Sequence, residues 1–176
     1  MSIVDFEKLK KDKEIMLSRR QARRFALQVL YCNEFLQEDI TSVANRIATS
    51  LEHNVDDFAR KLILKTYQNY DELDLLILNN LKDRDMERIA LLEKVLLRLA
   101  LSELLYFPDI PIEVTMNEAL DLTKEFISNR SSGFINGVLD AVLKDLENKN
   151  QIRKDLATRI RPRAKNKAKD FKGIKQ

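Results

Sequence analysis

The sequence predicts an all-α protein, and three observations carry this prediction. Only three glycines and three prolines occur in 176 residues, so the chain has few ways to form tight hairpins. Leu, Lys, Glu, Ala, Arg and Ile dominate the composition, and most of them favour helix. Apolar residues recur at the three- and four-residue steps of amphipathic helices. A chain of this length can bury one hydrophobic core, with room for two lobes.

The N-terminal part contains a short extension and four expected helices. Residues 1–17 place a few apolar residues among many charges, which is typical of a frayed or lightly docked helix. Ser18 is a suitable N-cap for the next helix, which ends at residues 37–39. The same apolar spacing predicts further helices over residues 41–52, from residue 56 or 57 to 67, and from 71 to 81.

The C-terminal part adds three more expected helices. After a charged connector at residues 82–85, residues 89–105 are apolar around most of the helix circumference, so this helix should be central and buried. Proline cannot sit inside a helix but suits its first turn, which places Pro111 at a helix start. Two helices follow, one from Pro111 to Phe126 and one from its N-cap Ser132 to Leu146, with a polar loop at residues 127–131 between them.

Gly137 lies inside the last expected helix. Glycine at such a position costs stability relative to alanine. Close packing of another helix explains the absence of a side chain, so we expect a neighbouring helix to pass against Gly137.

Charge is distributed unevenly along the chain. Residues 150–176 contain ten Lys or Arg and two acidic residues, a net charge of +8; since the whole chain carries +3, residues 1–149 carry −5. The tail has too few apolar residues to offset its ordering entropy, so we expect disorder when it is free. Such a tail suits a polyanion or acts as a solubilising end, and the acidic body suits a basic protein partner.

Several functional classes are excluded by composition. The single cysteine, Cys32, permits no internal disulfide and no cysteine-cluster zinc site, which fits a reducing, cytoplasmic setting. No apolar run approaches the roughly 20 residues that span a bilayer, and the N-terminus does not have the pattern of a secretory signal. We therefore expect no membrane partner.

No pattern of catalytic residues is present. His53 is the only histidine and lies in a polar segment, as a surface histidine would. Cys32 falls on the apolar side of its helix, where a small buried hydrophobe is expected rather than a nucleophile. The glycines at 133, 137 and 173 do not form a phosphate-binding loop. The sequence therefore predicts a protein that is not an enzyme and that uses no cofactor or metal.

The strongest functional signal is a cluster of arginines at a helix start. Arg19, Arg20, Arg23 and Arg24 lie within six residues. Four positive charges at the positive end of a helix dipole are unfavourable by themselves. A sequence that keeps this arrangement indicates an anionic ligand that compensates the charges. Arginine offers a planar fork of donors that fits phosphate, so the cluster predicts contact with RNA or DNA. The alternative is a solvated helix start with local salt bridges.

Two aromatic residues are candidates for base stacking beside this cluster. Tyr31 lies eight residues after Arg23, just over two helical turns. Phe134 begins the last helix and would contribute if that helix packs nearby. Unpaired bases stack on such rings for about 1–3 kcal/mol each. For both residues the alternative is an ordinary core position.

Three ordered segments within residues 18–146 resemble motifs of the NusB family of bacterial transcription antitermination factors. The first is the arginine-rich start that leads into an Ala-Leu-Gln-x-Leu-Tyr helix, and the second is a Glu-Lys-x-x-Leu-Arg-x-Ala helix. The third pairs a Pro-x-x-Val-x-Ile-Asn-Glu-Ala segment with Phe-Val-Asn-Gly-Val-Leu-Asp. In this chain they read RRQARRFALQVLY at 19–31, EKVLLRLA at 93–100, PIEVTMNEAL at 111–120 and FINGVLD at 134–140.

The resemblance implies a fold, a ligand and a partner. It implies seven helices in two small bundles, with residues 1–17 as an extension and 150–176 as a tail outside the domain at 18–149. It implies a non-enzymatic factor that binds the single-stranded boxA element of nascent ribosomal RNA. The implied protein partner is NusE, a small ribosomal subunit protein, within an RNA polymerase complex that resists termination. Members of such a family can form homodimers that hide the RNA face, and the sequence leaves the oligomeric state open.

The resemblance also assigns residues. Arg19, Arg20 and Arg23 match the basic RNA-contacting start, and Tyr31 and Phe134 match the aromatic positions. Glu93, with Glu87 as a weaker companion, matches the face that receives NusE. Asn117 and Glu118 match positions expected to tie the central helices together. Two alternative functions remain from the sequence: an RNA-binding module related to the N-terminal domain of rRNA cytosine methyltransferases, and a helical protein-interaction domain.

Overall fold

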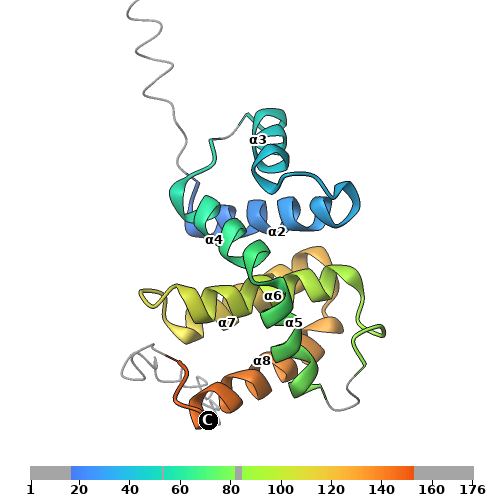
Figure 1. Cartoon of the computed structure of the whole chain (residues 1–176), viewed down its shortest axis with the longest axis vertical. Helices are drawn as coiled ribbons and strands as arrows, with labels where there is room; N and C mark the ends of the chain where they lie inside the picture. Colours follow the sequence, from blue (N-terminus) through green and yellow to red (C-terminus); the bar gives the residue numbers. More distant parts are fainter. Residues whose placement is uncertain (1–16, 53, 82–84, 153–176) are drawn as a thin grey trace, which may run out of the picture.

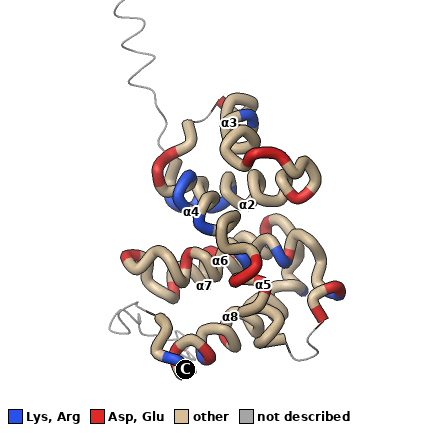
Figure 2. The backbone as a smooth tube through the Cα atoms, in the orientation of Figure 1, with Lys and Arg blue, Asp and Glu red and all other residues tan. Residues whose placement is uncertain are grey.

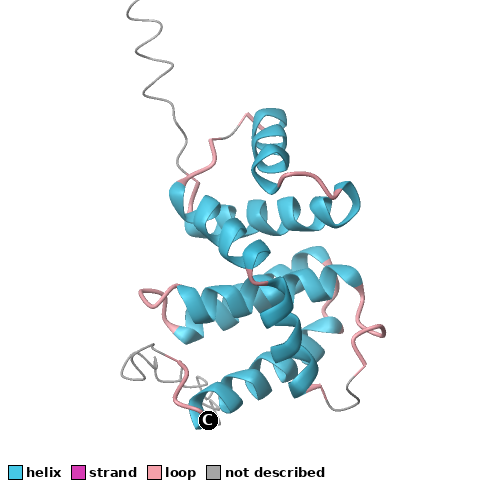
Figure 3. Ribbon diagram, viewed as in Figure 1, coloured by secondary structure: helices cyan, strands magenta, loops and turns pink. Residues whose placement is uncertain are grey.

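The computed structural model describes residues 17–52, 54–81 and 85–152. All regular structure within these ranges is helical, which confirms the predicted fold class (Figure 3). The described residues form seven helices, the number that the resemblance implied. His53, most of the N-terminal extension and most of the basic tail lie outside the described residues.

Three helices form the N-terminal sub-bundle, α2 (Arg19–Leu36), α3 (Ile40–Ser50) and α4 (Asp57–Gln68) (Figure 1). Each helix begins at an N-cap residue, which is Ser18 for α2, Asp39 for α3 and Asp56 for α4. In each case a side-chain oxygen of the cap accepts the backbone N–H of the residue three positions later. At Ser18 the cap is reciprocal, since the Gln21 side chain also accepts the Ser18 N–H. The predicted cap at Ser18 is confirmed.

Four helices form the C-terminal sub-bundle, α5 (Tyr70–Asn80), α6 (Leu91–Tyr106), α7 (Ile112–Phe126) and α8 (Ser131–Asn148). Helix α6 contains an unbroken run of buried residues from Val95 to Leu104. It packs against α5, α7 and α8 and also against α2 and α4, so it joins the two sub-bundles. The prediction of a central, buried helix here is confirmed.

Two local predictions in α8 are wrong. The helix begins at Ser131, with Arg130 before it and no side-chain cap, so Ser132 lies inside its first turn. The Ser131 N–H donates to the Ser128 hydroxyl of the preceding loop at 3.1 Å. Gly137 has no neighbouring helix against it, since a Cβ built there would meet no atom within 4 Å. The residue instead lines a cavity, where the missing side chain leaves space.

The single cysteine is half-buried and packs against the core, as a small apolar side chain would. Leu17, at the edge of the described region, is also buried in the core ahead of α2. No helix among the described residues is long and apolar enough to cross a membrane.

Candidate nucleic-acid interface

Three of the four clustered arginines are exposed at the start of α2. The side chains of Arg20 and Arg24 are 53% and 45% accessible, and Arg19 is also exposed. No acidic residue lies in the first turn of α2, so the helix does not itself compensate these charges. The guanidinium of Arg19 lies 4.1 Å from the centre of the Phe58 ring on α4, which gives it a cation–π contact.

The fourth arginine, Arg23, is buried and does not belong to the exposed cluster. Its Nε and Nη2 donate to both carboxylate oxygens of Glu103 on α6, at 2.7 and 3.0 Å. Its Nη1 lies 3.7 Å from Glu118 on α7, and the Thr115 hydroxyl donates to Glu103 at 2.6 Å. We call Arg23, Glu103, Thr115 and Glu118 the buried joint. The assignment of Arg23 as an RNA contact is corrected, because its donors are enclosed and used within the fold.

The position of Glu118 agrees with the structural role expected for it, since its carboxylate reaches the buried joint. Asn117 next to it is exposed.

Helix geometry places two of the exposed arginines, Arg20 and Arg24, in line with two aromatic rings. At 100° per residue, Arg20, Arg24, Tyr31 and Phe35 fall within about 60° of one another on α2. We call these four residues the α2 stripe. Tyr31 is half-buried and packs edge-to-face on Phe35, with ring centres 5.3 Å apart. Phe35 is 65% exposed, so the distal end of the stripe presents an aromatic face to solvent.

Phe35 is a residue that the sequence reasoning missed. The available signal was its position four residues after Tyr31, the i, i+4 spacing of neighbours on one helix face. Phe35 is not an isolated exposed ring, because it packs on Tyr31, and the two rings together form a continuous aromatic surface.

Basic residues of α4 extend the positive surface on one side of the α2 start. Lys61 and Lys65 lie one turn apart on α4 and are exposed, and Lys61 follows three residues after Phe58, the ring beneath Arg19. Figure 2 shows the Lys and Arg positions of α4 beside the first turns of α2. The sequence reasoning did not include these lysines, because the contact between α2 and α4 is a tertiary one.

Acidic residues of α7 pair with the other side of the α2 start. Arg20 Nη2 lies 3.1 Å from Asp121, and Arg24 Nη2 lies 2.7 Å from Glu125. Lys124 also approaches Asp121, at 3.5 Å. The arginines are therefore exposed but already engaged with carboxylates, so part of the alternative reading, a salt-bridged helix start, is correct.

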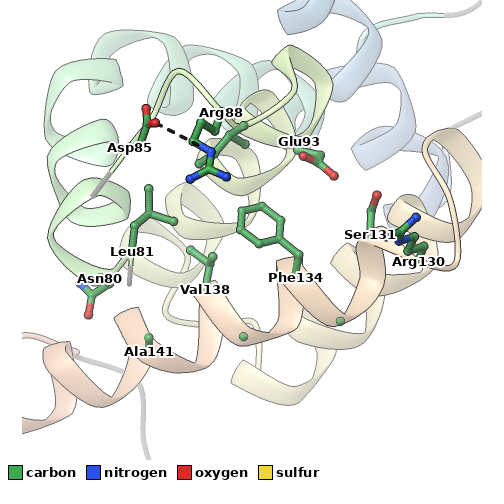
Figure 4. Close-up of a pocket in the computed structure, with 13 residues that line it drawn as sticks. Asn80, Leu81, Asp85, Arg88, Glu93, Arg130, Ser131, Phe134, Val138 and Ala141 are labelled. Atoms are coloured by element: carbon green, nitrogen blue, oxygen red, sulfur yellow. Dashed lines mark ion pairs between the residues drawn. The ribbon is translucent and has the colours of Figure 1, made fainter. Parts of the chain in front are cut away.

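Phe134, the other aromatic candidate, is not part of the α2 stripe and lies in a cavity of about 640 Å³. Figure 4 shows its ring directed into this cavity, between Leu81 and Val138 on one side and Arg130 on the other. The described residues that line the cavity come from α5, α6, α8 and the segment that precedes α6. No residue of α2 is among them, so Phe134 does not share the α2 stripe.

The two glutamates assigned to a protein partner lie at or near the same cavity. Glu93 lines it and is half-buried, and its Oε2 also accepts the Ala90 N–H at 3.3 Å, which caps the start of α6. Glu87 is exposed and lies two residues after Asp85, another lining residue. The cavity thus combines an aromatic ring, apolar walls and a rim of both charges.

A second buried arginine has a structural role. Arg98 on α6 donates to both oxygens of Asp74 on α5 and to Glu34 on α2, each at 2.7 Å. Its guanidinium lies 4.3 Å from the Tyr70 ring. Burial, with the nearby Glu34 charge, raises the pKa of Tyr70 above its usual range. The described residues contain no group of three or more His, Cys, Asp or Glu that could hold a metal ion.

Comparison with known proteins gives one consistent result. The model of the NusB family matches residues 20–144. A transcription antitermination protein NusB of Chloroherpeton thalassium is 34% identical over 143 residues, covering 80% of this chain and 68% of that protein. The solved structure of T. maritima NusB is 31% identical with a TM-score of 0.68, covering 74% of this chain and 94% of that one. A crystal structure of the antitermination factors NusB and NusE in complex with dsRNA matches at 25% identity and a TM-score of 0.65, covering 72% and 96%.

Proposed function

The chain belongs to the NusB family, and we propose that it is a transcription antitermination factor that binds boxA-type single-stranded RNA of nascent ribosomal transcripts in the cytoplasm. In this proposal it pairs with NusE and joins an RNA polymerase complex that resists termination. It acts by assembly and not by catalysis. A NusB–NusE complex with dsRNA has been solved for a protein of similar fold, which supports RNA as the ligand and NusE as the partner. The preference for a single strand rests on the α2 stripe alone.

The α2 stripe is the observation that carries the RNA part of the proposal. Exposed guanidinium groups of Arg20 and Arg24 offer paired donors for phosphate, and Arg19 lies beside them. Tyr31 and Phe35 continue the same helix face over a length of about 22 Å from Arg20. Phosphate contacts fix position, and rings that stack on bases need those bases unpaired. The combination favours a single strand over a duplex.

The cavity carries the partner half of the proposal. Glu93 supplies negative charge in its lining, Glu87 lies two residues after the lining residue Asp85, and Phe134 with its apolar neighbours supplies a surface that excludes water. A basic ribosomal protein matches this chemistry, and the excess of acid in residues 1–149 attracts it over a longer range. Phe134 also remains a proposed RNA contact, at a site apart from the α2 stripe.

Fluorescence anisotropy with a labelled boxA-like RNA tests the RNA half. The wild-type chain should bind the single strand more tightly than the same sequence annealed into a duplex. The double variant Arg20→Ala/Arg24→Ala should weaken binding by about five- to thirtyfold, because each lost contact in solvent contributes about 0.5–1 kcal/mol. The matched control Arg46→Ala/Lys149→Ala removes two equally exposed, ion-paired cations elsewhere and should change little. Equal losses in both double variants would refute the assignment of the α2 stripe.

Titration with purified NusE tests the partner half. Glu93→Gln and Glu87→Gln should weaken NusE binding, whereas Glu52→Gln, an exposed acid of the other sub-bundle, should not. Because Glu93 also caps α6, the thermal midpoint of each variant is measured alongside. Unchanged NusE affinity in a folded Glu93→Gln/Glu87→Gln variant would contradict the proposal.

A further inference from the structure

Two ion pairs connect the α2 stripe to α7 as parallel rungs. Arg20 and Arg24 are one turn apart on α2, and their partners Asp121 and Glu125 are one turn apart on α7. We call these two pairs the α2–α7 ladder. Matching i, i+4 spacing on both helices lets both pairs form together.

The ladder is exposed, in contrast to the buried joint next to it. Its carboxylates are 40% and 33% accessible and its guanidinium groups are about half accessible. Exposed ion pairs contribute little to stability because water and salt screen them. The pairs can therefore open without unfolding the helices that carry them.

A carboxylate and a phosphate use the same donors of an arginine. The carboxylate is planar and the phosphate is tetrahedral, but both present a pair of oxygen atoms that can accept two parallel N–H bonds from the guanidinium fork. In the free protein Asp121 and Glu125 thus occupy the positions that RNA phosphates would take on Arg20 and Arg24.

We propose that Asp121 and Glu125 compete with RNA phosphates for Arg20 and Arg24 and thereby set the RNA affinity of the chain. This inference rests on the proposed function, since it concerns the same RNA-binding stripe. Each carboxylate displaced by RNA must be released into solvent, which lowers the net gain from the new contact. The acids also weaken non-specific binding to any polyanion, because they reduce the positive potential at the α2 start.

The two rungs should not contribute equally. Asp121 neutralises Lys124 as well as Arg20, at 3.5 and 3.1 Å. Its removal frees two cations for RNA, whereas removal of the Glu125 charge frees Arg24. Asp121 is therefore the stronger competitor.

The test measures RNA affinity of Asp121→Asn and Glu125→Gln, which remove the charge and keep the side-chain shape. Binding of the labelled single-stranded RNA should tighten about two- to fivefold in each, with the larger gain in Asp121→Asn. Asp145→Asn is the matched control: it removes one carboxylate from an ion pair with the exposed Lys149 at the end of α8, in the other sub-bundle. This control should leave affinity unchanged.

A double-mutant cycle separates competition from a general charge effect. In the Arg24→Ala background, Glu125→Gln should no longer tighten binding, because no arginine remains to be released. A gain that persists there, or an equal gain in Asp145→Asn, would overturn the inference. Unchanged or weaker binding in both single variants would also overturn it, since the acids would then hold the arginines in position.

Failure of this inference differs from failure of the proposed function. If the wild-type chain binds the RNA and loses affinity in Arg20→Ala/Arg24→Ala, but the acid variants do not bind more tightly, only the competition is refuted. If neither the wild-type chain nor Asp121→Asn/Glu125→Gln binds the RNA, the proposed function and the competition are refuted together.

Discussion

Arginines lie on both sides of the first turns of α2, buried on one side and exposed to solvent on the other. On the inner side, Arg23 is 5% exposed and holds Glu103 with two short hydrogen bonds in the buried joint. On the outer side, Arg20 and Arg24 form single, solvent-accessible pairs with acids of α7. One arginine joins α2 to α6 and α7, and the others are available for exchange with a ligand.

The difference shows that burial and not residue type decides what a charged side chain does. A buried ion pair that loses one partner leaves an uncompensated charge away from water, which is strongly destabilising. An exposed pair that loses one partner is re-solvated at little cost. The same arginine cluster can therefore combine a fixed structural contact with exchangeable binding contacts.

The largest expected effect is on stability when the buried joint is broken. Arg23→Ala should lower the free energy of unfolding by about 3–5 kcal/mol, because the Glu103 carboxylate would lie in a buried site without its cation and with only Thr115 as a hydrogen-bond partner. Urea denaturation followed by circular dichroism measures the change.

Arg20→Ala is the comparison for this measurement, and it should change stability by no more than about 1 kcal/mol. If the two variants were equally stable, the inner and outer arginines would be energetically alike, and the contrast between the two sides of α2 would fail.

A smaller effect is expected from Thr115, which completes the joint. Its hydroxyl donates to Glu103 at 2.6 Å in a buried position. Thr115→Val keeps the shape but removes this charge-assisted bond, so stability should fall by about 1.5–3 kcal/mol. Thr115→Ser retains the donor and is the control. A Thr115→Val variant as stable as the wild type would show that Glu103 is satisfied by Arg23 alone.

The sequence was sufficient to predict the helices, because their signals are local. Apolar periodicity and the cap at Ser18 depend on residues within one helix, and both are observed. The all-round apolar character of residues 89–105 likewise predicted a central helix, observed as Leu91–Tyr106. Even so, α8 begins one residue before its expected cap, because the preceding loop bonds to its first residue: the Ser131 N–H donates to the Ser128 hydroxyl.

The division of roles among the arginines could not be predicted from the sequence. Arg23 and Arg24 are adjacent and chemically identical, and only the positions of α6 and α7 show that one faces Glu103 and the other Glu125. Those partners lie 80 and 101 residues away in the chain. Gly137 is a second case in which the sequence alone does not decide. A glycine inside a helix is compatible both with close packing of another helix and with an open cavity, and the structure shows the cavity.

On the outer side, the next effect concerns RNA affinity and not stability. Phe35→Ala should weaken single-stranded RNA binding by about 1–3 kcal/mol, or about five- to 150-fold, through loss of base stacking. Stability should change by less than about 1 kcal/mol, because the ring is mostly exposed and packs chiefly on Tyr31.

Two further substitutions identify the cause of that loss. Phe35→Trp keeps a flat ring and should retain affinity, whereas Phe35→Leu keeps apolar volume without a ring and should lose it. Equal affinity of the leucine and tryptophan variants would mean that Phe35 acts through apolar contact alone, and the stripe would not be a stacking surface.

The smallest expected effect is the contribution of the α2–α7 ladder to stability, and it provides the sharpest comparison with the buried joint. A cycle of Arg24→Ala, Glu125→Gln and the double variant should give a coupling free energy of about 0.2–1 kcal/mol, measured by urea denaturation. The value should fall as salt is added, because the pair is exposed to screening ions. A coupling above about 2 kcal/mol that salt does not reduce would place this pair in the same class as Arg23 and Glu103. Arg24 would then be fixed by the fold, and it could not exchange a carboxylate for a phosphate without a loss of stability that RNA binding would have to offset.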